Sequence, residues 1–155
     1  VYEKEILNRT NQNGVSVSIS QAVFSGNAQK LQDLLEDFML RSISSMDGAN
    51  EGFYHGMMLG LCAVLGNRYR IRSNREAGLG RFDIQLSPLV SGIPGFLFEF
   101  KHTKDERVNL AVLADSALQQ INEKKYDTEL RNAGVNSIIK IGIAFRGKNA
   151  VVKRG

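Results

Sequence analysis

The sequence predicts an α/β fold in which helices flank one mixed central sheet. The main observation is that the apolar residues change along the chain from helical spacing to strand alternation, and that this change occurs twice. The second observation is that the 155 residues contain no repeat, low-complexity tract or internal change in composition. We therefore expect a lead-in or linker over residues 1–18, which are polar and interrupted by glycine, and a single domain over residues 19–155.

The composition is typical of a water-soluble protein with a mild preference for anionic partners. Hydrophobic residues make up 43% and charged residues 23% of the chain, the net charge is +4, and no apolar run is long enough to cross a bilayer. The single cysteine, Cys62, cannot form an internal disulfide, and the opening "VYEKEIL" has neither a signal-peptide nor a transit-peptide pattern. We expect a cytoplasmic protein that does not enter the membrane, and the start without methionine indicates a piece of a longer chain.

Two helices are expected before the first strand. Between Ala28 and about Ser44 the apolar residues recur at helical spacing, and the glycine-containing segment "SSMDGAN" ends the pattern. A second helix is expected from about Glu51 to Leu65, because its apolar residues share one face and Gly66 follows at the usual C-terminal position. Both helices therefore have one face to bury.

Five strands are expected around one long helix. Alternating apolar residues occur in three segments, "RYRIRSNREA" from Arg68, "GRFDIQLSP" from Gly80 and "GFLFEFK" from Gly95. Residues 107–131 return to helical spacing, and "SIIKIGIAF" and "NAVVKR" then predict two final strands around an "RGKN" turn. The expected order is two helices, three strands, one helix and two strands.

Two acidic residues are expected to face each other across a β-hairpin. Side chains alternate along a strand, so the phenylalanines of "FLFEFK" point to one face and Glu99 and Lys101 to the other. If Ser87 faces Gly95 in an unbulged hairpin, Asp83 lies opposite Glu99, with the two Cβ atoms about 5 Å apart.

This pair of carboxylates would be repulsive unless a cation lies between them. A hard divalent ion such as Mg²⁺ binds carboxylate oxygens and keeps other positions for water and a substrate phosphate. Lys101 could orient or deprotonate an attacking water and offset charge that develops on the phosphate. The alternative is that Asp83 and Glu99 form salt bridges with Arg81 and Lys101 on a solvated face of the sheet.

Four blocks of the sequence resemble the PD-(D/E)XK nuclease superfamily. They are "FYHGMMLGL", "SNREAGLGRFDI", "LFEFK" and "ALQQINEKKY", and they include Asp83, fifteen intervening residues, and then Glu99, Phe100 and Lys101. Within the superfamily the blocks are similar to a bacterial family of domains found at the C-terminus of proteins with an N-terminal ATPase-like domain. The resemblance implies a restriction-endonuclease-like αβββαβ core. One departure is Phe82, which stands where the superfamily's name implies a proline.

The resemblance also implies roles for the acidic residues and the lysine. Asp83 and Glu99 would bind Mg²⁺, for which Mn²⁺ could substitute, and Lys101 would be the catalytic cation in the hydrolysis of a phosphodiester bond. Glu51 on the first core helix would be a further metal ligand. Alternatively, the Glu51 carboxylate would only complement the dipole at the helix N-terminus.

Further site residues are implied on the long helix and the first strand. Gln120, with Gln119 as the neighbouring alternative, would be a further catalytic residue. Gln120 and Tyr126 match a glutamine-to-tyrosine motif that many superfamily nucleases carry near the site, although packing would also explain the tyrosine. Arginines on one face of the first strand suit phosphate contacts, and an edge strand guarded by charge would look the same. The candidates for nucleic-acid contacts are Arg68, Arg70, Arg72, Arg81 and Tyr126.

The leading hypothesis is therefore a metal-dependent nuclease that acts on DNA or RNA. The alternative is a catalytically silent nucleic-acid-binding or regulatory module of a larger ATPase-like protein, which would keep the fold without hydrolysis. A purely structural domain is a third alternative. A homodimer would suit cleavage of a duplex.

Overall fold

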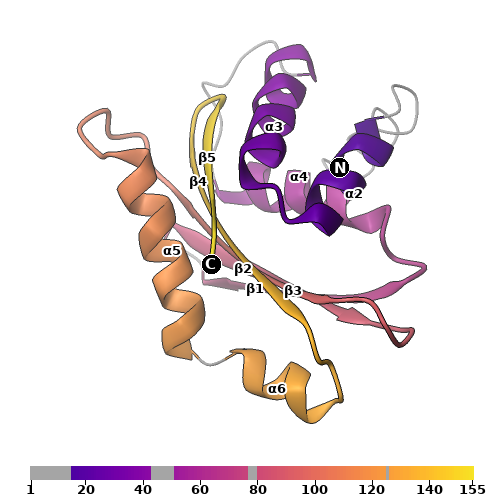
Figure 1. Cartoon of the computed structure of the whole chain (residues 1–155). Helices are drawn as coiled ribbons and strands as arrows, with labels where there is room; N and C mark the ends of the chain where they lie inside the picture. Colours follow the sequence, from indigo (N-terminus) through magenta and orange to yellow (C-terminus); the bar gives the residue numbers. More distant parts are fainter. Residues whose placement is uncertain (1–14, 43–50, 77–79, 125) are drawn as a thin grey trace.

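The computed structural model describes residues 15–42, 51–76, 80–124 and 126–155 (Figure 1). The helices and strands in chain order are α2 (Val15–Ser25), α3 (Ala28–Ser42), α4 (Glu51–Ala63), β1 (Tyr69–Glu76), β2 (Arg81–Pro88), β3 (Gly95–His102), α5 (Leu110–Lys124), α6 (Tyr126–Asn132), β4 (Ile138–Arg146) and β5 (Asn149–Arg154). The run from α4 to β4 contains the αβββαβ order that the sequence predicted, with α6 as an addition.

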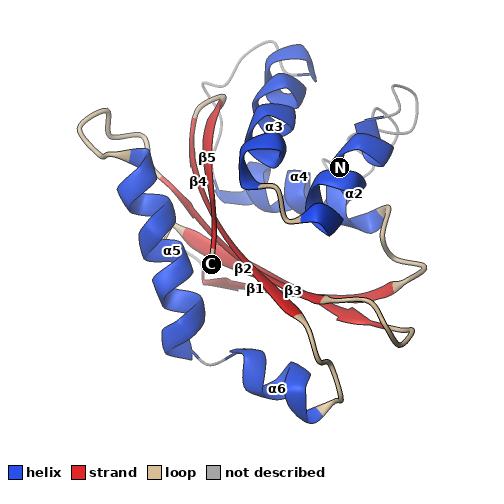
Figure 2. Cartoon of the chain, viewed as in Figure 1, coloured by secondary structure: helices blue, strands red, loops and turns tan. Residues whose placement is uncertain are grey.

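The strands form one mixed sheet in the order β1-β2-β3-β4-β5. Strands β3 and β4 are parallel, and the other neighbouring pairs are antiparallel. The connection from β3 to β4 contains α5, because parallel neighbours need a crossover rather than a tight turn. Helices α2, α3 and α4 lie on one side of the sheet, and α5 and α6 lie on the other (Figures 1 and 2). No helix in the described part of the chain is both long and apolar enough to span a bilayer.

Strand alternation sorts the buried side chains to the two sides of the sheet. The side toward α2, α3 and α4 carries the larger core, which includes five phenylalanines of the strands: Phe82, Phe96, Phe98, Phe100 and Phe145. The side toward α5 and α6 carries smaller apolar clusters, among them Leu97 with Ile121 and Leu130. Polar side chains occupy the rest of this second side, so it is the side on which a functional site can form.

Helix α2 begins at Val15, inside the segment that was expected to be a lead-in. Residues 1–14 lie outside the described part of the chain, so the expectation for them is not addressed. Ile19, Ala22 and Val23 are 4%, 1% and 5% exposed and recur at helical spacing. This spacing prevails over the short alternation of "VSVSI", because a helix can bury these side chains in the main core. The division into a lead-in over 1–18 and one domain over 19–155 stays a prediction.

The long helix expected over residues 107–131 is two helices, α5 and α6, and Figure 1 shows that they run in different directions. Helix α5 starts at Leu110 because the Asn109 side chain accepts a hydrogen bond from the Val112 N–H at 3.1 Å, as an N-cap residue does. In α6, Leu130 is 3% exposed and packs in the cluster with Leu97. The change of direction lets both helices cover the sheet.

Candidate active site

The hairpin of β2 and β3 places two carboxylates opposite each other. Asp83 pairs with Glu99 in the observed register, as predicted from an unbulged hairpin. The two residues are 4% and 1% exposed. Both lie on the side of the sheet toward α5 and α6, where Arg81 of β2 and Lys101 of β3 are the next cross-strand pair. The geometry therefore creates a buried acidic pair with cations along the same strands.

The carboxylate of Asp83 is held by donors from two other elements. Asn74 of β1, which pairs with Asp83 in the sheet, donates from Nδ2 to Oδ1 at 3.3 Å. Tyr126 at the start of α6 donates from its hydroxyl to Oδ2 at 3.0 Å. Burial raises the pKa of Asp83, and these hydrogen bonds oppose the increase. Asp83 is thus fixed in orientation by both of its oxygens.

Glu99 is more deeply buried and less completely paired. Its Oε1 lies 3.8 Å from Nζ of Lys124, at the end of α5. Its Oε2 is buried and has no hydrogen-bond partner among the described residues. Burial raises the pKa of Glu99 to about 7; the Lys124 ammonium lowers this pKa, and the Asp83 carboxylate raises it further. A buried carboxylate oxygen without a partner is costly, which suggests a ligand at this position.

Gln120 lies beside the acidic pair on the buried face of α5. It is 8% exposed, and with its amide oxygen turned to the cations it accepts from Arg81 Nη1 at 2.7 Å and from Lys124 Nζ at 3.2 Å. Gln119, the neighbouring alternative, is on the exposed face of the same helix and donates to Glu123 at 3.1 Å. Of the two glutamines, it is therefore Gln120 that contacts Arg81 and Lys124, the second of which pairs with Glu99.

The donor set could hold a hard divalent cation. Asp83 and Glu99 supply oxygen ligands, and the unpartnered Oε2 of Glu99 marks where ligation is missing. A Mg²⁺ ion is typically bound by one or two carboxylates and completes its shell with waters and substrate phosphate, so this pair is sufficient. The opposed negative charges also need neutralisation by a cation.

The structure places Glu51 on the other side of the sheet from this pair, and its role as a metal ligand stays a prediction. It begins α4, which packs on the phenylalanine side of the sheet, and its Oε2 is 3.5 Å from Nε of Arg75. In residues 15–42, 51–76, 80–124 and 126–155, no three or more His, Cys, Asp or Glu side chains gather into a possible metal site. Glu51 lies with α4 on the phenylalanine side, whereas the side chains of the acidic pair point to the other side of the sheet.

The structure also separates the arginines that were expected to share one face. Arg70 and Arg72 are exposed residues of β1, but Arg68 lies in the turn before the strand. Its guanidinium is 5.9 Å from the ring centroid of Phe24 in α2, on the other side of the sheet. The alternation that would align all three residues begins only at Tyr69, so the prediction for Arg68 is wrong in its placement.

Arg70 and Arg72 border a cavity of about 240 Å³ that also includes Gln85, Ser87 and Glu129. Arg72 donates from Nη1 to Oε1 of Glu129 at 3.0 Å. Gln85 is two residues from Asp83 on β2, and side chains two residues apart share a face of a strand. The two exposed arginines therefore lie on the same side of the sheet as the acidic pair.

Two residues at the site, Lys124 and Asn74, were absent from the sequence prediction. Lys124 follows Gln120 by four residues on α5, so helical spacing places both on one face. Asn74 could be found only from the pairing of β1 with β2. The four-residue spacing of Gln120 and Lys124 is visible in the sequence, but it could not indicate a site residue before the position of Gln120 was known.

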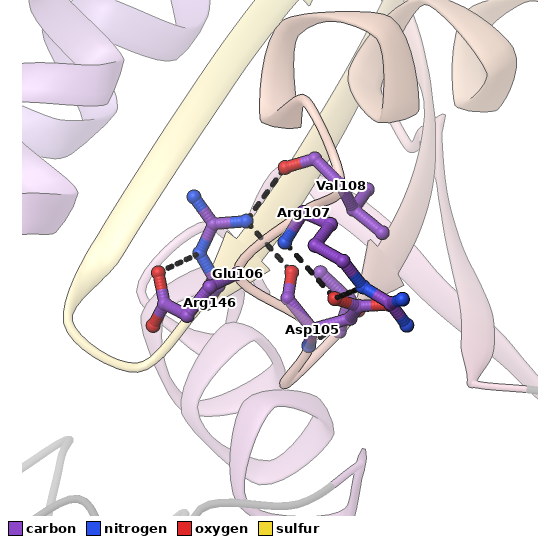
Figure 3. Close-up of polar contacts among 6 residues, drawn as sticks. Asp105, Glu106, Arg107, Val108 and Arg146 are labelled. Carbon is purple, nitrogen blue, oxygen red and sulfur yellow. Dashed lines mark hydrogen bonds and ion pairs between the residues drawn. The ribbon is translucent and has the colours of Figure 1, made fainter.

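The loop between β3 and α5 is held to the end of β4 by Arg146 (Figure 3). Arg146 donates from Nη1 to the backbone oxygens of Asp105 at 3.0 Å and Val108 at 2.7 Å, and its Nε is 3.5 Å from Oε2 of Glu106. Arg107 instead binds both carboxylate oxygens of Asp105 within the loop. Because the loop joins the strand of Lys101 to α5, Arg146 helps to position both sides of the site.

Replacing Arg146 by methionine should lower the free energy of unfolding by about 2 kcal/mol, because two backbone carbonyls lose a charged donor. The Arg146 side chain is only 20% exposed, whereas that of Arg107 is 90% exposed. Arg107→Gln is therefore the matched control, with a much smaller expected effect. Urea unfolding followed by circular dichroism measures both variants, and equal losses of stability would contradict the role given to Arg146.

Comparison with known protein families identifies the superfamily of this chain. A family model described as PD-(D/E)XK nuclease superfamily matches residues 49–155, which include every described strand and both carboxylates. A search of curated proteins found no match. The five-stranded mixed sheet and the αβββαβ order are consistent with a restriction-endonuclease-like fold. The chain therefore belongs to the PD-(D/E)XK nuclease superfamily.

Proposed function

We propose that this domain is a Mg²⁺-dependent nuclease that hydrolyses phosphodiester bonds at the pair of Asp83 and Glu99. The observation that carries the proposal is the buried, opposed pair of carboxylates in which Oε2 of Glu99 has no partner in the described part of the chain. A sheet built only for stability would not place two carboxylates in this arrangement. Superfamily membership supports a nuclease-type function, and superfamily members generally use divalent metal ions.

Asp83 and Glu99 would hold the metal ion, and Mn²⁺ would be an adequate substitute for Mg²⁺. When bound, the ion would polarise the phosphate and lower the pKa of a water molecule. Asn74 and Tyr126 orient Asp83 through its two oxygens. This support matters because small errors in ligand orientation weaken metal binding and catalysis.

Lys101 is the proposed catalytic cation. It lies two residues beyond Glu99 on the same side of β3, opposite Arg81. In hydrolysis, the water oxygen forms a bond to phosphorus, the bond to the leaving oxygen breaks, the water loses a proton and the leaving oxygen gains one. The Lys101 ammonium would orient the water and stabilise the negative charge that develops on the phosphate. Gln120 would hold the side chain of Arg81, which lies opposite Lys101, through a hydrogen bond to its guanidinium group.

Arg70, Arg72 and Arg81 are the proposed contacts to the nucleic-acid backbone. The first two are exposed beside the cavity on the side of the sheet that carries the acidic pair. Their guanidinium groups can neutralise phosphates without reading the base sequence. Tyr126 was expected to contact nucleic acid, and its hydroxyl is engaged with Asp83, so a positioning role is better supported.

The setting of the domain is proposed from the resemblance of the four sequence blocks. The domain would work in the bacterial cytoplasm as the C-terminal part of a protein with an N-terminal ATPase-like domain. A homodimer would allow two sites to act on the two strands of a duplex. A catalytically silent binding or regulatory module is the second candidate, because the ion pair of Lys124 with Glu99 already provides a positive charge beside the carboxylates.

The test is cleavage of labelled single-stranded and double-stranded DNA and RNA with Mg²⁺, Mn²⁺ or EDTA. We expect cleavage of at least one substrate with either metal and none with EDTA. Binding of nucleic acid in EDTA, measured in parallel, separates recognition from hydrolysis. Binding without cleavage under every metal condition would favour the silent module, and absence of both would contradict the proposed function.

A further inference from the structure

Lys124 is the cation that makes the ion pair seen with Glu99. It is the last residue of α5, and its Nζ is 3.8 Å from Oε1 of Glu99. The same Nζ is 5.4 Å from the ring centroid of Tyr126 and 3.2 Å from the amide oxygen of Gln120 in the orientation described above. The ammonium is therefore surrounded by three residues of the proposed site and lies at the edge of the carboxylate pair.

Lys124 differs from Lys101 in the element that carries it, and its side chain can move. Lys101 belongs to β3 of the hairpin, whereas Lys124 reaches Glu99 from α5, the helix that packs on this side of the sheet. Its side chain is 26% exposed, and a lysine stem is flexible, so the ammonium can move toward solvent without a shift of the backbone. Of the cations near Glu99, it also favours the ionised carboxylate most strongly.

We propose that Lys124 is the internal counter-ion of the Asp83 and Glu99 pair, and that its ammonium and a divalent metal ion compete for Glu99. This inference rests on the proposed function, because it takes the pair to be the metal site. Two cations at one carboxylate repel each other, so occupation by a metal ion weakens the contact with Lys124. Conversely, Lys124 keeps the two carboxylates compatible with burial when no metal ion is bound.

An uncharged residue at position 124 should have two linked effects on the protein. Removal of the Lys124 charge should strengthen metal binding, because the competing cation is gone. It should also destabilise the metal-free protein, because a buried pair of like charges then loses its counter-ion. Linkage requires that the loss of stability shrink as metal is added, since metal ions stabilise the variant more than the wild type.

The experiment is a calorimetric titration with Mn²⁺ at pH 8.0, using the wild type, Lys124→Met and Lys124→Arg. We expect Lys124→Met to bind Mn²⁺ about tenfold more tightly than the wild type, and Lys124→Arg, which keeps the charge, to remain close to the wild type. Lys140→Met is the matched control, because Lys140 is 23% exposed, pairs with Asp127 at 3.6 Å and lies outside the carboxylate pair. The affinity of Lys140→Met for Mn²⁺ should equal that of the wild type.

A second readout is the melting temperature of the same proteins in EDTA and in saturating Mn²⁺. Lys124→Met should melt below Lys140→Met in EDTA, and the difference should shrink or reverse in Mn²⁺. If Lys124→Met does not fold in EDTA, Lys124→Gln is refolded with Mn²⁺ present, and the rise of its melting temperature with Mn²⁺ concentration is compared with that of the wild type.

The outcomes separate this inference from the proposed function on which it rests. Asp83→Asn is titrated with Mn²⁺ under the same conditions. Mn²⁺ binding that is lost in Asp83→Asn but is equal or weaker in Lys124→Met than in the wild type would overturn the role of Lys124 and leave the metal site intact. Absence of Mn²⁺ binding in the wild type, or binding unaffected by Asp83→Asn, would overturn both.

Discussion

Asp83→Ala is expected to reduce metal-dependent cleavage by about 10³-fold or more, because the loss of a ligand forfeits several kcal/mol of charge stabilisation. The fold should survive, since removal of one carboxylate also removes its repulsion with Glu99. The cost is that the donors of Asn74 and Tyr126 lose their acceptor. Initial cleavage rates with Mg²⁺, together with circular dichroism, measure activity and folding separately.

Asp83→Asn refines this experiment because it keeps the size of the side chain and an acceptor oxygen. It should be as inactive as Asp83→Ala and closer to the wild type in stability. Asp115→Asn removes a carboxylate from the exposed face of α5 and should retain full activity. Wild-type cleavage rates in both Asp83 variants would show that the pair is not the catalytic site.

Gly142→Ala is expected to cause the largest loss of stability among single small substitutions at the site. Gly142 lies on β4 beside Glu99, and α5 crosses directly over it. A Cβ at this position would be 2.5 Å from the Ala114 backbone oxygen and 2.8 Å from the Leu118 backbone nitrogen. Backbone atoms in a packed helix cannot yield locally, so α5 must move away from the sheet. We expect a decrease of about 3 kcal/mol in the free energy of unfolding.

The same substitution should impair the site, because α5 carries Gln120 and Lys124 to the carboxylates. Gly95→Ala on β3 is the matched control: its Cβ would approach the side-chain methyls of Leu130 and Val135 at 3.2 and 3.3 Å. These methyls can shift, so a cost of about 1 kcal/mol, the low end for overpacking, is expected. Urea unfolding and cleavage rates are measured on both variants. Equal stability of the two, or full activity of Gly142→Ala, would contradict the role of the close contact.

The part of the site that lies on the hairpin could be predicted in detail. The pairing of Asp83 with Glu99 follows from the two-residue period of strands and from the length of the connecting segment. The burial of the phenylalanines on the opposite side follows from the same period. Both are local properties of two adjacent strands, which is why they needed no knowledge of the helices.

The helices were predicted less completely. The end of α5 and the start of α6 could not be separated in the apolar pattern of residues 107–131, and α2 was missed behind the alternation of "VSVSI". Tyr126 shows the consequence, since its hydroxyl reaches Asp83 because α6 takes a new direction. The spacing of apolar residues predicts which face of a helix is buried, but it does not predict the direction of the helix axis.

By itself, the sequence determined which residues of the β2–β3 hairpin share a face, which carboxylates oppose each other, and the superfamily to which the blocks belong. The tertiary structure decided that Lys124 of α5 meets Glu99 and that Glu51 of α4 meets Arg75 of β1. The physical reason is that strand faces depend on a local two-residue period, whereas contacts between layers depend on how closely each helix approaches the sheet. At this site that approach is permitted by the missing side chain of Gly142, far from the carboxylates in sequence and next to Glu99 in space.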